Sequence, residues 1–296
     1  MTRRTLLATS LGAAAAAALN AAPADNTRLP IKKAVGWGML PPDLSELDKF
    51  KLTKDCGFQE MECQTTPDRA KAEELLAASR ETGIRIHSVM NMDHWKYPLS
   101  SSDHSVVDKS IAGMETSLHN AKLWGADTVL LVPGVVNPET SYEQCYERSR
   151  ANIFKLIPLA KQLGVVIAVE EVWNKFLVSP VDYARYIDSF GSPQIKAYFD
   201  VGNVVLYGYP QQWIRTLGPR IAKLHIKDFY FRKGETKWVN LGEGDIKWNA
   251  IYSALADVGY RGSATLEVAG GGADYLKDVS ARFERILSGG EQVAAG

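Results

Sequence analysis

The chain contains 296 residues, of which 46% are hydrophobic and 23% are charged, so it is long enough for one large globular domain. It carries 34 basic and 34 acidic residues, and no run of Lys and Arg stands out from this balance. Because nucleic-acid-binding surfaces are usually basic, we expect no nucleic-acid partner.

The first 24 residues have the pattern of a twin-arginine export signal. Arg3 and Arg4 precede a weakly hydrophobic Ala-rich run, and Ala22-Pro23-Ala24 offers a cleavage site of small residues. We therefore expect residues 1–24 to be the signal, residues 25–296 to form the domain, and the protein to be exported to the periplasm. The alternative, a lone N-terminal helix, would need neither the paired Arg residues nor the cleavage site. The apolar run is too short for stable membrane insertion, although an uncleaved signal could serve as an anchor.

The chain has three cysteines, Cys56, Cys63 and Cys145, without the spacing of a known motif. We expect no disulfide framework, even in an oxidising compartment. Buried free thiols are the favoured interpretation, and a single bridge is the alternative.

Strand-like and helix-like segments alternate through the first half of the domain. Thr66-Pro67-Asp68 offers a cap, a Pro at the first helical position and an acid in the first turn, and Gly83 would end that helix. A long segment, residues 91–104, is rich in Ser and aromatic residues. Strands are predicted over 33–39, 58–63, 84–90 and 127–132, and helices over 44–54, 66–82 and 105–124.

The alternation continues through the second half. Ser141 and Gln144 have the spacing of a capping box and predict a helix that reaches Leu163, bent near Pro158. Ser179-Pro180 predicts the start of another helix. Further strands are predicted over 165–170, 195–200, 221–226 and 263–268, and further helices begin near 211, 247 and 274.

Eight strand–helix alternations without a linker or an internal repeat predict a single-domain (β/α)8 TIM barrel. The strands are short and nearly all apolar, which is typical of a parallel sheet that is buried on both faces. A doubly wound open sheet is the alternative, but no Gly-rich dinucleotide-binding turn follows the first strand.

Each of the last four predicted strands ends with a potential metal ligand: Glu170, Asp200, His225 and Glu267. A polar group at the end of a buried run is costly unless something binds it. The C-terminal ends of barrel strands converge, so we expect these four side chains to meet. Three carboxylates and one imidazole suit one divalent cation, such as Mn²⁺, Mg²⁺ or Co²⁺. Any one of them could instead cap a helix or pair with a Lys, but four on neighbouring strands favour one site.

The segments that carry these residues resemble the xylose-isomerase-like sugar isomerase/epimerase superfamily. Its members include ketose 3-epimerases, hydroxypyruvate isomerases and hexulose- or pentulose-phosphate epimerases. The resemblance covers nearly all of the mature chain. The matching segments are 169–177 (VEEVWNKFL), 198–203 (YFDVGN), 225–228 (HIKD), 242–248 (GEGDIKW) and 265–267 (TLE).

The resemblance implies that one cation is held by Glu170, Asp200, His225 and Glu267. It also implies that Glu170 and Glu267 flank the substrate as the two acid/base groups. They would transfer a proton within an α-hydroxyketone substrate by way of an enediolate. The cation would acidify the C–H bond beside the carbonyl. Relatives often have Asn after the first of these ligands, where this chain has Glu171.

Four residues are expected to contact the sugar. His94 lies in the segment after the third strand, which suits a lid or a platform, and we expect it to donate to or accept from substrate hydroxyls. Trp173 is expected to stack on the sugar, and Arg232 to contact substrate oxygens. Asn203 stands where relatives often have a His, so the hydrogen bonding of the substrate is expected to differ. Surface or core packing is the alternative for His94, Trp173 and Arg232.

Two features have two interpretations each. Gly270-Gly271-Gly272 follows the eighth strand, where barrel enzymes often hold phosphate, but a plain connector is favoured, and export favours a free sugar. Asp228 either orients a metal ligand or forms a surface ion pair with Lys227.

The predicted function is that of a metal-dependent sugar isomerase or epimerase with a small-molecule sugar as its partner, and the chain could assemble as a homo-oligomer. A lyase on keto-glycosides would use the same proton abstraction, and an exported sugar-binding protein is an alternative from another class. An endonuclease-IV-like repair enzyme shares the barrel but needs more His ligands than the five His of this chain provide.

Overall fold

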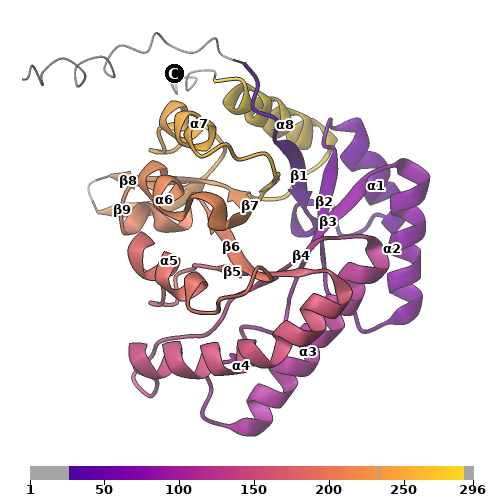
Figure 1. Ribbon diagram of the computed structural model, residues 1–296. Helices are drawn as coiled ribbons and strands as arrows, with labels where there is room; N and C mark the ends of the chain where they lie inside the picture. Colours follow the sequence, from indigo (N-terminus) through magenta and orange to yellow (C-terminus); the bar gives the residue numbers. More distant parts are fainter. Residues whose placement is uncertain (1–26, 233, 290–296) are drawn as a thin grey trace, which may run out of the picture.

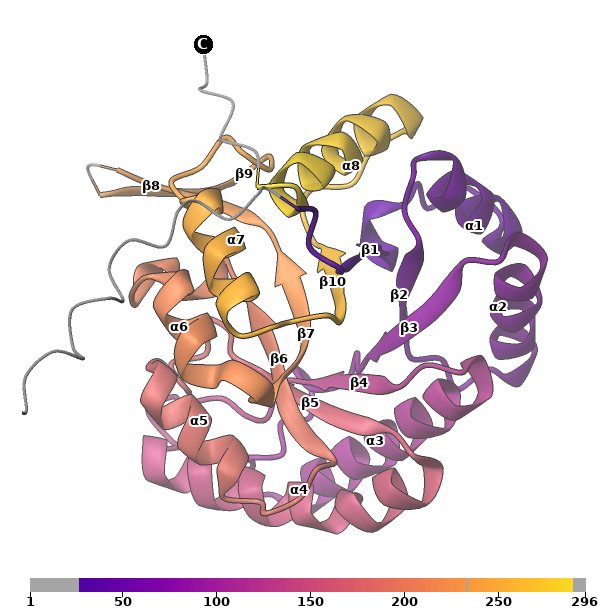
Figure 2. The same ribbon diagram turned by 45° about the horizontal axis from the view of Figure 1, so that its top comes forward.

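Eight parallel strands form a closed barrel, and helices lie around the outside of the ring (Figure 1, Figure 2). The computed structural model describes residues 27–232 and 234–289, so the predicted export signal lies outside the described residues. The prediction of a single-domain (β/α)8 barrel is confirmed. Around the ring the strands are β1 Lys32–Gly36, β10 Ser263–Leu266, β7 Ile221–Ile226, β6 Ile195–Asp200, β5 Val166–Glu170, β4 Thr128–Leu131, β3 Arg85–Met90 and β2 Glu60–Gln64.

Local sequence signals explain most helix boundaries. Ser141 and Gln144 form the predicted capping box at the start of α4. Gly83 ends α2 with φ of 77°, a left-handed conformation that glycine adopts without steric cost. The helices are α1 Glu46–Asp55, α2 Arg69–Thr82, α3 His104–Trp124, α4 Tyr142–Leu163, α5 Pro180–Asp188, α6 Pro210–Leu217, α7 Trp248–Asp257 and α8 Ala273–Leu287.

Two predicted boundaries differ from the structure by three residues each. The cap of α2 is Asp68, whose carboxylate accepts hydrogen bonds from the amides of Ala70 and Lys71, so Pro67 precedes the helix rather than starting it. The first strand ends at Gly36, because the chain turns there into the short 3-10 helix η1, Trp37–Met39.

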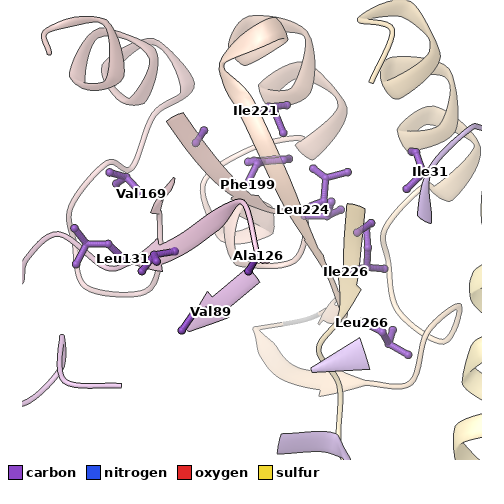
Figure 3. Close-up of a cluster of buried hydrophobic side chains, with 14 of the residues drawn as sticks. Ile31, Val89, Ala126, Leu131, Val169, Phe199, Ile221, Leu224, Ile226 and Leu266 are labelled. Atoms are coloured by element: carbon purple, nitrogen blue, oxygen red, sulfur yellow. The ribbon is translucent and has the colours of Figure 1, made fainter. Parts of the chain in front are cut away.

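Side chains alternate between the two faces of each barrel strand. On β5, Ile167 and Val169 face outwards into the main hydrophobic core, whereas Ala168 belongs to a separate cluster inside the barrel. Figure 3 shows outward-facing residues of this kind, among them Val169, Phe199 and Leu224 on three neighbouring strands. The same alternation turns Glu170 towards the barrel interior.

An antiparallel hairpin, absent from the sequence-based prediction, follows β7. It consists of β8 Asp228–Arg232 and β9 Glu235–Val239, and it projects from the barrel near α7 (Figure 2). The carboxylate of Asp228 holds its base, because Asp228 Oδ2 accepts hydrogen bonds from the amides of Gly242 and Gly244 and from Trp248 Nε1. These partners lie far along the chain, so local sequence did not reveal the hairpin.

All three cysteines are buried and free, as the favoured interpretation predicted. Among residues 27–232 and 234–289, none of the helices has the length and apolar character needed to cross a bilayer.

Candidate active site at the C-terminal end of the barrel

The four predicted ligands lie together inside the C-terminal mouth of the barrel. Glu170 and Asp200 are the last residues of β5 and β6, His225 is next to last in β7, and Glu267 follows β10 directly. One potential ligand atom from each of them lies within 4.8 Å of all the others. Parallel pairing sets this arrangement, since Asp200 is in register with His225 and His225 with Thr265.

His225 lies at the centre of the cluster. Its Nδ1 is 2.8 Å from Glu170 Oε1, 3.3 Å from Glu267 Oε2 and 3.7 Å from Asp200 Oδ2. The imidazole and Asp200 are completely buried, whereas the side chain of Glu267 is 35% exposed. One nitrogen and three carboxylates therefore converge on a point that solvent reaches from the side of Glu267.

Burial and mutual repulsion perturb the charges of the cluster. Burial raises the pKa of Glu170 to about 7, although His225 opposes the shift. Burial would also raise the pKa of Glu267, but the positive charges of His225 and Lys227 lower it below its usual value. For His225, burial would lower the pKa, but Glu267, Glu62 and Glu170 raise it well above its usual value. Two acids with opposite shifts in one site are typical of acid/base catalysts.

The cluster has the donor set of a divalent-cation site. Asp200 Oδ1 accepts hydrogen bonds from the amides of Gly202 and Asn203, which fixes the carboxylate. Asp200 Oδ2 is buried and accepts no hydrogen bond of good geometry. A buried carboxylate oxygen requires positive charge nearby, which the Lys227 ammonium supplies in part from 2.8 Å and which a bound cation would complete. Oxygen-rich sets with one imidazole suit Mn²⁺, Mg²⁺ or Co²⁺, so the residues present fit the predicted cation.

Lys227 was not predicted to belong to the site. Its ammonium lies 2.8 Å from Asp200 Oδ2 and 2.6 Å from Glu267 Oε2, so it partly neutralises the carboxylates. Burial would lower its pKa, but the two carboxylates raise it above its usual value. Two alternatives were open for Asp228. The surface ion pair with Lys227 is wrong, because Lys227 pairs with the cluster. The hydrogen bonds of the Asp228 carboxylate join it to Phe229, Gly242, Gly244 and Trp248 rather than to one of the four predicted ligands.

Glu62 is a second residue that sequence reasoning missed. It comes from β2, across the barrel, and its Oε1 lies 2.9 Å from His225 Nε2. Its Oε2 accepts hydrogen bonds of 2.5 Å from Ser88 Oγ and Tyr198 OH. Glu60 and Glu62 alternate with apolar residues along β2, and this pattern was the available signal that they face into the barrel. Glu62 thus holds the imidazole so that Nδ1 faces the other three ligands.

Glu171, whose role was open, lies behind the cluster. It is buried, and its Oε1 accepts a hydrogen bond from the amide of Asp200. Its carbonyl oxygen accepts a hydrogen bond from Asn203 Nδ2. Burial raises the pKa of the Glu171 carboxyl well above its usual range. Glu171 therefore supports Asp200 and Asn203 from outside the barrel axis.

Three of the four residues predicted to bind substrate line one cavity with Glu170 and Glu267: His94, Trp173 and Asn203. His94 is only 4% exposed and its Nδ1 has no hydrogen-bond partner, and burial lowers its pKa to about 4. Trp173 stacks on Trp238 of the hairpin at 4.9 Å, and its Nε1 donates to the carbonyl oxygen of Asn203. A neutral imidazole and an indole face are suitable partners for sugar hydroxyls and a sugar ring.

The fourth residue, Arg232, does not line this cavity. It lies at the end of β8, exposed to solvent, with Nε 2.7 Å from Asp245 Oδ1. The hairpin carries Arg232 away from the barrel axis. The distance along the sequence from His225 to Arg232 gave no indication of this.

The fold and this cluster define a (β/α)8-barrel protein with a candidate metal site in its C-terminal mouth. The chain belongs to the xylose isomerase-like TIM-barrel family, whose model matches residues 50–285.

Curated relatives of this family are sugar-phosphate epimerases by name. SgbU of Escherichia coli K12, provisionally named an L-ribulose-5-phosphate 3-epimerase, is 29% identical over 244 residues, which cover 77% of this chain and 85% of SgbU. The L-ribulose-5-phosphate 3-epimerase UlaE of Escherichia coli K12 is 27% identical over 244 residues, with 77% and 84% covered. These are names of isomerase-class enzymes, in agreement with the predicted class.

Solved structures share the fold at lower identity. The 3-keto-D-glucoside 4-epimerase YcjR of E. coli superposes with a TM-score of 0.72 at 18% identity, covering 86% of this chain and 99% of YcjR. A D-tagatose 3-epimerase-like protein has a TM-score of 0.73 at 16% identity, with 87% and 98% covered.

Proposed function

We propose that the protein is a divalent-metal-dependent sugar isomerase or epimerase that moves a proton within an α-hydroxyketone. One observation carries the proposal. Glu170 and Glu267 face the cavity, whereas Asp200 and His225 are completely buried and do not line it. The cluster therefore divides into two residues that can only hold a cation and two that can also reach a substrate.

Glu170 and Glu267 are assigned the proton transfer. Both carry one oxygen close to His225 Nδ1, and both border the same cavity. One carboxylate removes the proton from the carbon beside the carbonyl, and the other returns a proton. Return to the opposite face of the same carbon gives an epimer, and return to the neighbouring carbon gives an isomer.

A cation held by Glu170, Asp200, His225 and Glu267 would polarise the substrate carbonyl and so acidify the adjacent C–H bond. The chain's own residues supply the remaining functions. His94 and Asn203 offer hydrogen bonds to substrate hydroxyls, and the stacked Trp173 and Trp238 line one side of the cavity.

The proposal is tested by exchange of substrate C–H for solvent deuterium. Protein loaded with Mn²⁺ is incubated in D2O with free and phosphorylated ketoses, and loss of the C–H signal is followed by NMR. We expect exchange from at least one ketose that is abolished by a chelator and restored by Mn²⁺. Exchange that is indifferent to the chelator, or absent from every ketose, would contradict the proposal. Release of a substituent from a keto-glycoside would instead identify the lyase reaction.

We also propose that the chain is exported, on the basis of Arg3, Arg4 and the cleavage pattern at Ala22-Pro23-Ala24. N-terminal sequencing of the protein recovered from its native periplasm should begin near Asp25. Recovery of the full-length chain from the cytoplasm alone would contradict this assignment.

A further inference from the structure

Three cavities meet at Glu267. The cluster lobe, about 250 Å³, contains Glu170, His94 and Trp173. The lining of the Trp37 lobe, about 230 Å³, includes Trp37, Gly38, Met39, Glu62, Gln64 and Met90, and that of the Tyr275 lobe, about 270 Å³, includes Asp228, Asn240, Glu243 and Tyr275. Glu267 lines all three. Ligand pockets usually measure about 300–1,000 Å³, so a substrate is expected to occupy more than one lobe.

The described residues that line these lobes provide no unpaired side-chain cation. Among the described residues that line them, Lys227 is the one cation, and its ammonium already pairs with Asp200 and Glu267. Burial lowers the pKa of His94 to about 4, so its imidazole is neutral at pH 7. Phosphate sites use Arg, Lys or free backbone amides, so the side chains provide no phosphate partner that is not already engaged.

The glycine run after β10 has a packing role instead. The amide of Gly271 donates a hydrogen bond to the carbonyl oxygen of Met39. A Cβ at Gly270 would lie 2.7 Å from the same oxygen, and a Cβ at Gly271 would lie 2.7 Å from the ring of Tyr275. These glycines permit close contact between the segment after β10 and the segment after β1. The Gly271 amide is consequently not available to a phosphate.

The Tyr275 lobe, which adjoins this segment, is unfavourable for an anion. Its lining includes the carboxylates of Glu243, Asp228 and Glu267, and Arg282, the partner of Glu243, does not line the lobe. Asp274 adds a further acid in the first turn of α8, where the helix dipole would otherwise favour phosphate.

The Trp37 lobe combines apolar surface with the carboxylates of Glu62 and Glu267. Trp37, Met39 and Met90 provide apolar surface, and Gln64 adds an exposed amide. Lys49 lies 4.7 Å from the centroid of the Trp37 ring but does not line the lobe. Aromatic and Met side chains suit the face of a ring, and the Gln64 amide can bond polar groups on it. Because the two carboxylates disfavour an anion, the lobe suits an uncharged ring.

We infer that the substrate is an unphosphorylated keto-sugar that carries a second, uncharged ring. The keto-sugar occupies the cluster lobe and its attached ring occupies the Trp37 lobe, with Glu267 at the junction. This inference rests on the proposed function for the identity of the reacting sugar. It distinguishes this chain from SgbU and UlaE, whose names specify a sugar phosphate.

The test compares three matched probes with Mn²⁺-loaded protein: 3-ketoglucose, its 6-phosphate and phenyl 3-keto-β-glucoside. C–H exchange is measured in D2O below saturation. We expect the phenyl glycoside to exchange at least about tenfold faster than the free sugar, and the phosphate at least about tenfold slower, each equivalent to one contact worth about 1.4 kcal/mol. A phosphate that exchanges as fast as the glycoside would overturn the inference.

A variant at Gly38 localises the second ring. Gly38 lines the Trp37 lobe, a Cβ there meets no atom within 4 Å, and its φ is not positive, so Gly38→Leu adds volume at this lobe without backbone strain. We expect Gly38→Leu to reduce exchange of the phenyl glycoside at least about tenfold more than that of 3-ketoglucose. Equal reductions for both probes would place the ring elsewhere and overturn the inference.

Binding separates this inference from the proposed function. Quenching of tryptophan fluorescence by each probe measures binding without turnover, because Trp37 and Trp173 line the lobes. The glycoside could quench the fluorescence of the wild type, and of Gly38→Leu more weakly, while no probe shows exchange. That result would overturn the proposed function and support the inference. Exchange of the phosphate alone would support the proposed function and overturn the inference.

Discussion

His225 and Glu62 form a hydrogen-bonded pair across the barrel, with 2.9 Å between His225 Nε2 and Glu62 Oε1. His225 is on β7 and Glu62 on β2, so the pair joins opposite sides of the ring. The other imidazole nitrogen faces Glu170 at 2.8 Å. A carboxylate at one nitrogen fixes the orientation of the imidazole and leaves the other nitrogen for a metal.

Replacement of Glu62 by Gln should weaken metal binding. The amide oxygen is a neutral and therefore weaker acceptor for His225 Nε2 than the carboxylate, so it holds the imidazole less firmly and makes it less basic, and we expect Mn²⁺ affinity to fall about 10–100-fold. Competition with a fluorescent chelator measures the dissociation constant. Ser88→Ala is the matched control, because it removes only a partner of the other Glu62 oxygen and should change the affinity less. Unchanged affinity in Glu62→Gln would show that the pair does not position the ligand.

Lys227→Met should destabilise the metal-free protein more than the metal-loaded protein. The variant leaves three carboxylates around His225 without the ammonium that lies within 3 Å of two of them. We expect the Tm in chelator to fall by at least about 5 °C and the gain on adding Mn²⁺ to increase. Lys237→Met is the control, because Lys237 is 56% exposed on the hairpin. An identical Mn²⁺-dependent gain in wild type and Lys227→Met would refute the role of Lys227 as counter-charge.

The buried imidazole of His94 should make stability depend on pH. Burial lowers its pKa from the usual 6.5 to about 4, so the unfolded chain binds the proton first as the pH falls. The wild type should therefore lose stability relative to His94→Gln between pH 6.5 and 4, by up to about 3 kcal/mol. Urea unfolding at several pH values measures the difference. A difference that is constant over this range would show that His94 titrates normally.

Asp228→Ala should loosen the hairpin and the segment it holds. The Asp228 carboxylate is completely buried and accepts hydrogen bonds from two backbone amides and from Trp248. Loss of a buried acceptor leaves these donors unpaired, and we expect about 3 kcal/mol less stability in urea unfolding. Asp257→Ala, which removes an exposed ion pair with Arg215, should cost less than about 1 kcal/mol. Similar losses in both variants would mean that Asp228 does not hold the hairpin.

Eight strand–helix alternations predicted the barrel, and the polar residues near the ends of its last four strands predicted the cluster, because a barrel brings strand ends together. Glu62 was missed since its role depends on a partner on the opposite side of the ring. The β8–β9 hairpin was missed because Asp228 holds it through residues 242–248. That hairpin also moves Arg232 away from the cavity. Local sequence patterns could not predict these contacts, because the residues that make them lie far apart in the sequence.

The central claim is that Glu170 and Glu267 transfer the substrate proton. Its most direct test is the rate of C–H exchange into D2O by Mn²⁺-loaded Glu170→Gln and Glu267→Gln. Metal content and Tm are measured in parallel, and Glu74→Gln, on the exposed face of α2, is the matched control. We predict that each site variant loses exchange by about 10²–10⁴-fold while remaining folded, and that Glu74→Gln keeps the wild-type rate. Wild-type exchange in both folded site variants would contradict the assignment.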